Sequence, residues 1–236
     1  MINTYDVIHD KISLKEEDIM NYLKTCKEKN CGHLYIELRH DNKFLDHYII
    51  QWPDSKDIVD NKYNNIRITI ECSHNKFYCR NLSIRNYDDT YYGSDDECYN
   101  YYNQNTITIN NVRHSISIES SYSFYTTITI QCQASHIRIN HASYISTLRL
   151  DCCACIDCLQ IMNGSFIDKL LLFNSIVENG IYVCDEDKKA ISKVVLVSSL
   201  VIYHDYFYRE PSAVLLNYNN YNIDVLLNCS CILKDE

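Results

Sequence analysis

Apolar residues recur along this chain in short strand-like segments, with a period of about eleven residues. From 136 to 183 each block opens with two apolar residues separated by one position, and small residues follow about five positions later. The apolar pairs are Ile137 and Ile139, Leu148 and Leu150, Leu159 and Ile161, Leu170 and Leu172, and Ile181 and Val183. One strand per fixed period is typical of a solenoid, in which neighbouring repeats bury a continuous core.

The pattern extends beyond this region in both directions. Segments of the same kind occur at 66–70, 82–84, 107–109, 116–118, 128–130 and 225–227, and 194–203 is apolar throughout, which predicts one strand buried on both faces. Two blocks supply two strands and two bends, so one turn of the chain takes roughly 22 residues. The segments 86–104 and 204–211 break the pattern and are predicted to be loop insertions.

Residues 1–60 follow a different pattern. Ser13 and Glu16 fit a capping box, and the apolar spacing after them predicts a helix over 14–29. Alternating residues predict strands over 33–39 and 44–52. Because a solenoid needs its terminal apolar surface covered, we predict an N-terminal α/β cap over 1–60 and a β-solenoid over 61–236.

The blocks resemble the strand half of a leucine-rich repeat, since Ile145, Leu148, Leu150 and Cys153 fall on its first four fixed positions. A block of this length leaves no room for the helix that such repeats place on their convex side. The length therefore favours a mainly β fold of the parallel β-helix type. An antiparallel β-sandwich is the alternative, because short strands with a spacing of about 8–12 residues also predict it.

Composition suggests the cellular setting. The chain has 13 cysteines, 21 tyrosines, only 4 glycines and 2 prolines, and its first residues contain no apolar signal core. Cysteines within apolar segments and no secretion signal favour a reduced, cytoplasmic location. Abundant Ile, Asn, Tyr and Cys with scarce Gly and Pro resemble proteins of cytoplasmic large DNA viruses, poxviruses above all. That resemblance implies the host cytoplasm and a host protein as partner.

The charge excludes some partners. The formal net charge is −9, whereas nucleic acids and anionic membranes attract clustered Lys and Arg. No apolar run approaches the roughly 18 residues of a transmembrane helix. We therefore expect a protein partner, with no nucleic acid and no membrane, and self-association as a further option.

Four cysteines, Cys152, Cys153, Cys155 and Cys158, lie close together and include a C-x-x-C spacing. Thiolates at this spacing bind zinc or perform redox chemistry. Outside 152–158, however, the chain has no C-x-x-C pair, and the equivalent positions of neighbouring blocks carry small residues. We favour cysteines that fill a tight bend, and we predict no metal and no cofactor.

Catalytic residues are not evident. Glycosidases of the β-helix type use outward carboxylates on neighbouring turns, whereas outward positions here are mostly Thr, Ser, Arg and Gln. Asp157 and Asp168 share a phase of the repeat, but because they are one block apart they fall on opposite sides of a turn. The sequence thus favours no enzyme.

The acidic segment 86–104 contains the most unusual surface residues. Tyrosine is favoured at protein interfaces, because it offers a large apolar area and a polar tip. The candidate binding residues are Tyr87, Tyr91, Tyr92, Tyr99, Tyr101 and Tyr102.

The leading functional hypothesis is a non-enzymatic protein-binding module. The compositional resemblance implies a viral host-interaction or defence-antagonist protein. The alternatives are a polysaccharide hydrolase or lyase on a β-helix, and a self-assembling structural or virion component.

Overall fold

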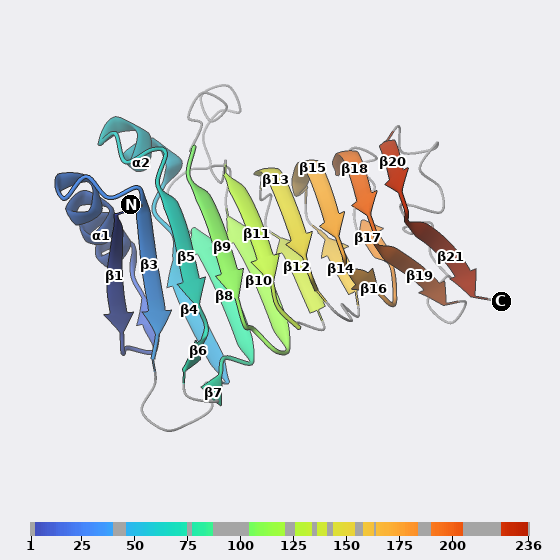
Figure 1. Ribbon diagram of the computed structural model, residues 1–236, viewed down its shortest axis with the longest axis horizontal. Coiled ribbons are helices and arrows are strands. Elements are labelled where there is room, and N and C mark those ends of the chain that lie inside the picture. Colours follow the sequence, from blue (N-terminus) through green and yellow to red (C-terminus); the bar gives the residue numbers. More distant parts are fainter. Residues whose placement is uncertain are drawn as a thin grey trace.

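The computed structural model describes residues 3–39, 46–74, 77–86, 104–120, 126–133, 136–140, 144–153, 158–162, 164–183, 190–204 and 223–235. These residues form a mainly β fold dominated by parallel sheets, with two helices near the N-terminus (Figure 1). The prediction of a mainly β fold with parallel strands is therefore confirmed. No helix in these ranges is long and apolar enough to cross a membrane.

Sheet A forms one side of the molecule and faces the viewer in Figure 1. Its strands, in spatial order, are β1 (Thr4–His9), β3 (His33–Leu38), β5 (Arg67–Glu71), β9 (Thr106–Asn110), β11 (Thr127–Gln131), β13 (Tyr144–Asp151), β15 (Phe166–Phe173), β18 (Ile191–Val197) and β20 (Asp224–Asn228).

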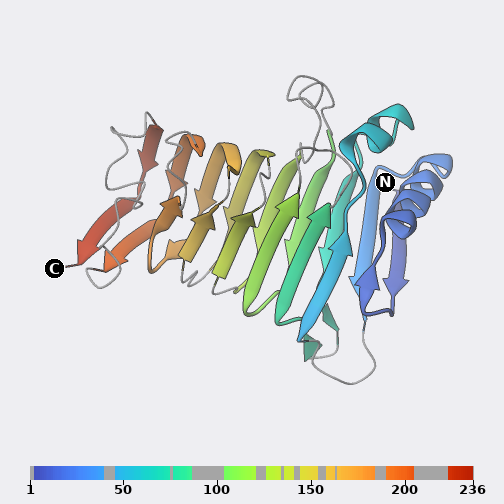
Figure 2. The same cartoon turned by 180° about the vertical axis from the view of Figure 1, so that it is seen from behind.

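Sheet B forms the opposite side, which faces the viewer in Figure 2. Its strands are β2 (Ser13–Leu14), β4 (His47–Gln51), β8 (Asn81–Asn86), β10 (Ser115–Ser120), β12 (His136–Asn140), β14 (Cys158–Ile161) and β17 (Ile181–Val183). Sheet D, near the C-terminal end, contains β16 (Ile176–Val177), β19 (Leu200–His204) and β21 (Cys231–Asp235). The only antiparallel pair of described strands is β6 (Ser73–His74) with β7 (Phe77–Tyr78).

From β1 to β5 and from β8 to β15, successive strands alternate between the two long sheets. The register shows how far the chain travels before it returns to the same sheet. In sheet A, Ile107 pairs with Ile128, and Ile128 in turn pairs with Leu148. In sheet B, Ile137 pairs with Leu159. Each of these steps along the sequence spans two of the blocks that the apolar pattern defines.

The core lies between the sheets and is built from ladders of equivalent positions. Inward side chains stack rung on rung and exclude water, while their sequence neighbours face outward. One fully buried ladder in sheet A contains Ile68, Ile107, Ile128, Leu148, Leu170 and Val194.

Helix α1 (Glu16–Glu28) covers the N-terminal end of this core and buries Ile19, Leu23 and Cys26. Its start differs from the prediction. The N-cap is Lys15, whose backbone N–H donates to Asp18 Oδ2 at 3.2 Å, whereas Ser13 lies in β2. Pairing of β2 with β4 buries Leu14 completely, and this tertiary contact overrides the local capping signal.

Residues 1–60 also contribute strands to both long sheets, through β1 to β4. A short helix, α2 (Ser55–Asp60), was not predicted from the pattern. Its N-cap is Asp54, whose carboxylate accepts the backbone N–H of Lys56 at 2.8 Å.

A repeated corner follows several strands of sheet A. After β9, β13, β15, β18 and β20 the next residue has a positive φ, between 47° and 62°; these residues are Asn111, Cys152, Asn174, Ser198 and Cys229. From β13 onward the residue that follows the corner belongs to a hydrogen-bonded ladder that we call the serine ladder: Cys153, Ser175, Ser199 and Ser230.

This corner corrects the prediction of a single strand over 194–203. The chain turns at Ser198, where φ is 49°, and forms two strands, β18 and β19, in different sheets. Buried Ser199 stabilises the turn, because its hydroxyl donates to Val197 O at 2.8 Å and accepts the N–H of Ser175 at 3.1 Å.

Candidate functional site

The six predicted tyrosines, Tyr87, Tyr91, Tyr92, Tyr99, Tyr101 and Tyr102, lie outside the described residues. Their role in binding therefore stays a prediction. The loop predicted at 204–211 also falls outside the described ranges, apart from His204 at the end of β19.

The structure separates the predicted cysteine cluster. Cys152 is exposed at the corner after β13, and Cys153 is buried in the serine ladder with its thiol 3.2 Å from Ile130 O. Cys158 is buried at the start of β14, in the other long sheet, and Cys155 lies outside the described ranges. Among the described residues there is no group of three or more His, Cys, Asp or Glu side chains that could hold a metal ion.

The Cys153 thiol also contacts Cys132, one rung earlier. This hydrogen bond lowers the pKa of Cys153, and burial opposes it. Both side chains are buried, so a reagent in solvent reaches neither directly. The two thiols fill the inner side of the corner.

Two carboxylates meet on the outer face of sheet A. Glu37 and Glu71 are register partners on neighbouring strands, although β4 and α2 lie between them in the sequence. Arg39 donates two hydrogen bonds of 3.1 Å to Glu37, while Ser73 and Asn111 donate to Glu71 at 2.6 and 2.7 Å.

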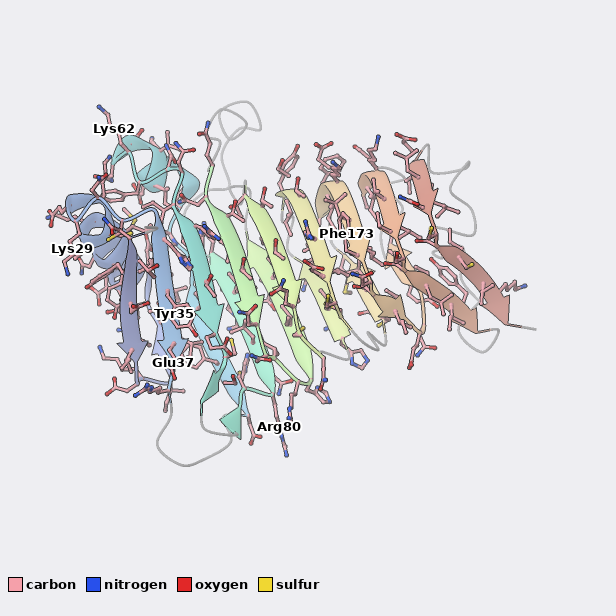
Figure 3. All side chains as sticks on the ribbon, viewed as in Figure 1. Lys29, Tyr35, Glu37, Lys62, Arg80 and Phe173 are labelled. Atoms are coloured by element: carbon pink, nitrogen blue, oxygen red, sulfur yellow. The ribbon has the colours of Figure 1, made fainter. Side chains whose placement is uncertain are left out.

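Carboxylates on neighbouring strands are the kind of pair that the hydrolase alternative needs, and this pair was not predicted from the sequence. Donors already occupy oxygens of both carboxylates. Arg39 binds Glu37 from two residues along the chain, and Asn111 connects Glu71 to the corner after β9. Burial, together with Glu71 and Glu37, raises the pKa of the adjacent Tyr35 phenol. Tyr35 and Glu37 lie near the N-terminal end of the outer face (Figure 3).

His33, on the same face, makes the fold sensitive to pH. Its Nε2 lies 2.9 Å from Thr69 Oγ1, and burial and the Arg67 guanidinium lower its pKa below the ordinary 6.5. The unfolded chain therefore binds more protons than the folded chain between the lowered pKa and 6.5. The free energy of unfolding should fall as the pH decreases through that interval and should not change above it on account of this group.

We expect His33→Gln to reduce this acid sensitivity, because the amide keeps a hydrogen-bonding group but does not titrate. Urea unfolding at pH 7.5 and pH 5.5 measures the effect, and the difference between variant and wild type isolates His33 from other histidines. An identical pH dependence in both proteins would exclude His33 as the cause.

The outer face of sheet A changes character at β15. On β5, β9 and β11 the central outward position carries Thr69, Thr108 and Thr129. From β15 onward that central outward position is apolar, and on β15 and β18 so is the next outward position. We call this set the outer apolar patch: Leu171, Phe173, Val195, Val197 and Leu226.

The members of this patch are register neighbours. Leu171 pairs with Val195, which pairs with Leu226, and Phe173 pairs with Val197. Leu226 is 49% exposed, and the others are partly exposed because neighbouring rungs shield one another. Phe173 marks the patch in Figure 3.

Cationic side chains border the patch. The Arg149 guanidinium lies 4.2 Å from the centre of the Phe173 ring and forms a 2.8 Å ion pair with Asp151. Lys169 and Lys193 are register partners on the strands that carry Leu171 and Val195, and Lys193 also pairs with Asp224 at 2.8 Å. The site is thus an apolar surface with charged side chains along one edge, where Asp151 and Asp224 pair with two of the cations.

One sequence signal for this patch was available. The segments Leu170–Phe173 and Val194–Val197 are apolar at outward and inward positions alike, whereas earlier strands alternate with Thr or Arg. For 194–203 that loss of alternation predicts burial on both faces. In the structure the outward side chains of β18 remain partly exposed.

Comparison with known proteins gives no further guide: no family model, no curated protein and no solved structure matches this chain.

Proposed function

We propose that this protein is a non-enzymatic protein-binding module and that the outer apolar patch is its contact surface. The observation that carries the proposal is the change from threonine to contiguous Leu, Val and Phe on one regular outer face. Contiguous exposed apolar side chains with a polar rim are typical of protein interaction sites.

We further propose that the scaffold is a parallel β-helix-like solenoid. Its support is the alternation of strands between sheets A and B, with a return to the same sheet after two blocks in the regular part. Stacked parallel strands give an extended, rigid face, which suits recognition of another folded surface better than chemistry in a cleft.

The rim indicates the partner's chemistry. A complementary surface presents apolar or aromatic side chains to the patch and an acidic side chain to Lys169, whereas Lys193 is already paired with Asp224. The compositional resemblance to poxvirus proteins extends the proposal to a host cytosolic protein, with antagonism of a defence response as the role.

Substitution of the patch centre tests the proposal. We expect Leu171→Lys with Val195→Lys to reduce partner recovery at least tenfold, equivalent to about 1.4 kcal/mol, because the two charges enter an apolar contact beside two existing lysines. The measurement is affinity capture on tagged full-length protein from eukaryotic cytosol, with quantitative mass spectrometry.

The matched control is Thr108→Lys with Thr129→Lys, which adds the same charge in the same outward row of β9 and β11. It should leave the captured partner unchanged. Circular dichroism and the unfolding midpoint establish that both variants are folded. Equal loss in the two variants, or no saturable partner for the wild type, would contradict the proposal.

A further inference from the structure

The C-terminal end of helix α1 holds two cysteines side by side. The helix ends in a left-handed capping turn, in which Asn30 has a positive φ of 54°. The N–H of Cys31 donates to Cys26 O at 2.8 Å, and the N–H of Asn30 donates to Lys27 O at 2.9 Å. This pair of hydrogen bonds brings the side chains of Cys26 and Cys31 together. Lys29, the C-cap of α1, marks this turn in Figure 3.

The two positions usually carry an apolar pair in turns of this kind, but here they carry thiols. The two thiols are in hydrogen-bond contact, and Cys26 Sγ also donates to Cys31 O at 3.1 Å. Because the Cys31 nitrogen lies 2.8 Å from Cys26 O, standard bond lengths limit the two Cα atoms to a separation of about 6.7 Å or less. Disulfides form at Cα separations of roughly 4.4 to 6.8 Å. The folded backbone therefore already meets the main geometric condition for a disulfide.

Two other close cysteine pairs in the described part of the chain are closed to solvent. Cys72 and Cys79 lie at the base of the β6–β7 hairpin, where the N–H of Cys79 donates to Cys72 O at 3.0 Å. Cys132 and Cys153 are in contact at the corner after β13. All four side chains are buried, whereas Cys31 is only partly buried. Of these three pairs, the one at the end of α1 can therefore meet a reagent in solvent without opening of the fold.

Burial gives the two thiols of this pair different roles. Desolvation raises the pKa of the Cys26 thiol to about 11, and the nearby Cys31 thiol raises it further in the same direction, so Cys26 is protonated at neutral pH. Cys26 is also completely buried. Thiol–disulfide exchange begins with attack by an accessible thiolate. Cys31 is therefore the thiol that reacts first with an oxidant, and Cys26 is the thiol that then closes the bond.

We propose that Cys26 and Cys31 form a reversible dithiol–disulfide site whose oxidant is a small-molecule disulfide of the glutathione type. The Cys31 thiolate attacks one sulfur of oxidised glutathione, the S–S bond of the oxidant breaks, and one glutathione leaves. Cys26 then loses its proton and attacks the Cys31 sulfur of the mixed disulfide, and the second glutathione leaves. The two protein thiols are oxidised to one disulfide, and their two protons end on the two glutathione thiols. This inference goes beyond the proposed binding function and does not depend on it.

The disulfide would fix the turn that carries the chain from α1 into sheet A. Cys31 lies two residues before β3, and Cys26 belongs to the core that α1 covers. A covalent bond that fits the native turn and closes a short loop in the unfolded chain stabilises the folded state. We therefore expect the thermal unfolding midpoint to rise by roughly 5 °C on oxidation and to return to its first value on reduction.

Oxidation of the folded full-length chain tests the proposal. The protein is incubated with oxidised glutathione, remaining thiols are alkylated, and the chain is digested with trypsin. Because lysines separate the two cysteines, the disulfide links peptides 25–27 and 30–39, which mass spectrometry detects directly. This link should form about tenfold faster, or more, than a link between Cys72 and Cys79, because those buried thiols react only when the fold opens. The comparison is internal to the wild type and needs no variant.

Two serine variants separate the steps. Cys26→Ser should stop the reaction at the mixed disulfide, with one glutathione on Cys31 and no rise in the unfolding midpoint. Cys31→Ser is the matched control and should leave Cys26 reduced, because that thiol is completely buried. Circular dichroism establishes that both variants are folded. A wild type without the link, a link that forms no faster than that of Cys72 and Cys79, or Cys26 that reacts equally well in Cys31→Ser would each overturn the proposal.

Discussion

Gly180→Ala should lower the free energy of unfolding by roughly 3 kcal/mol. Alanine is strained in the left-handed backbone conformation found here, and its methyl group would overpack the core. Gly180 has a φ of +84° directly before β17. A Cβ there would overlap the Tyr203 ring at Cε1 and Cδ1 and lie 2.9 Å from Cζ. Tyr203 is completely buried, so its ring has no free space in which to move.

The damage extends to the end of sheet B. If the ring shifts, its hydroxyl loses both hydrogen bonds to Ile181, and the backbone of β17 is left with unsatisfied buried groups. Urea unfolding followed by circular dichroism measures the change.

Gly164→Ala is the matched control, because Gly164 also has a positive φ, +69°, but nothing lies within 4 Å of its added Cβ. It should cost only about 1 kcal/mol for the backbone conformation. If the two variants were equally destabilised, the close approach of Tyr203 would not be the cause.

The sequence predicted those parts of the fold that depend on repetition. Apolar pairs such as Ile137 and Ile139 recur with their rung neighbours Leu159 and Ile161, and this regular spacing is enough to predict stacked strands. The scarcity of hairpin-turn sequences predicted that neighbouring strands pair in parallel. The one described antiparallel hairpin, β6 with β7, has no Asn-Gly signal.

Predictions from local sequence features were wrong where tertiary contacts decide the conformation. Ser13 resembles an N-cap in isolation, but burial of Leu14 in β2 places the helix start later. The apolar segment from 194 to 203 resembles one strand, because its two serines fit a strand as well as a corner. Only the neighbouring Ser175, one rung earlier, shows that Ser199 belongs to a ladder.

The candidate site could not be assembled from the sequence, because its residues are joined by irregular separations. Val195 and Leu226 are register partners, as are Glu37 and Glu71, yet the chain between the members of each pair is longer than the two blocks that the repeat predicts. An insertion lengthens the chain between two register partners without changing which residues pair. The outer face can therefore be mapped only when the pairing of strands is known.

The serine ladder leads to the second large effect: Ser175→Ala should lower the free energy of unfolding by about 2 kcal/mol. The Ser175 hydroxyl accepts the backbone N–H of Cys153 at 3.2 Å and donates to Phe173 O at 2.8 Å. Phe173 O keeps a second donor, the N–H of Cys152, after the substitution. The N–H of Cys153 instead loses the hydroxyl that accepts it, and Cys153 is completely buried, so water cannot replace that acceptor.

Ser230→Ala is the matched control, because Ser230 occupies the last rung of the same ladder. Its hydroxyl accepts the N–H of Ser199 at 3.0 Å and donates to Asn228 O at 2.9 Å, but it is partly exposed. Water can replace it there, so the loss should stay below about 1 kcal/mol. Paired urea titrations decide between the two positions. Equal losses would mean that burial does not set the strength of these bonds, and the ladder would then be a consequence of the corner geometry instead of a cause of its stability.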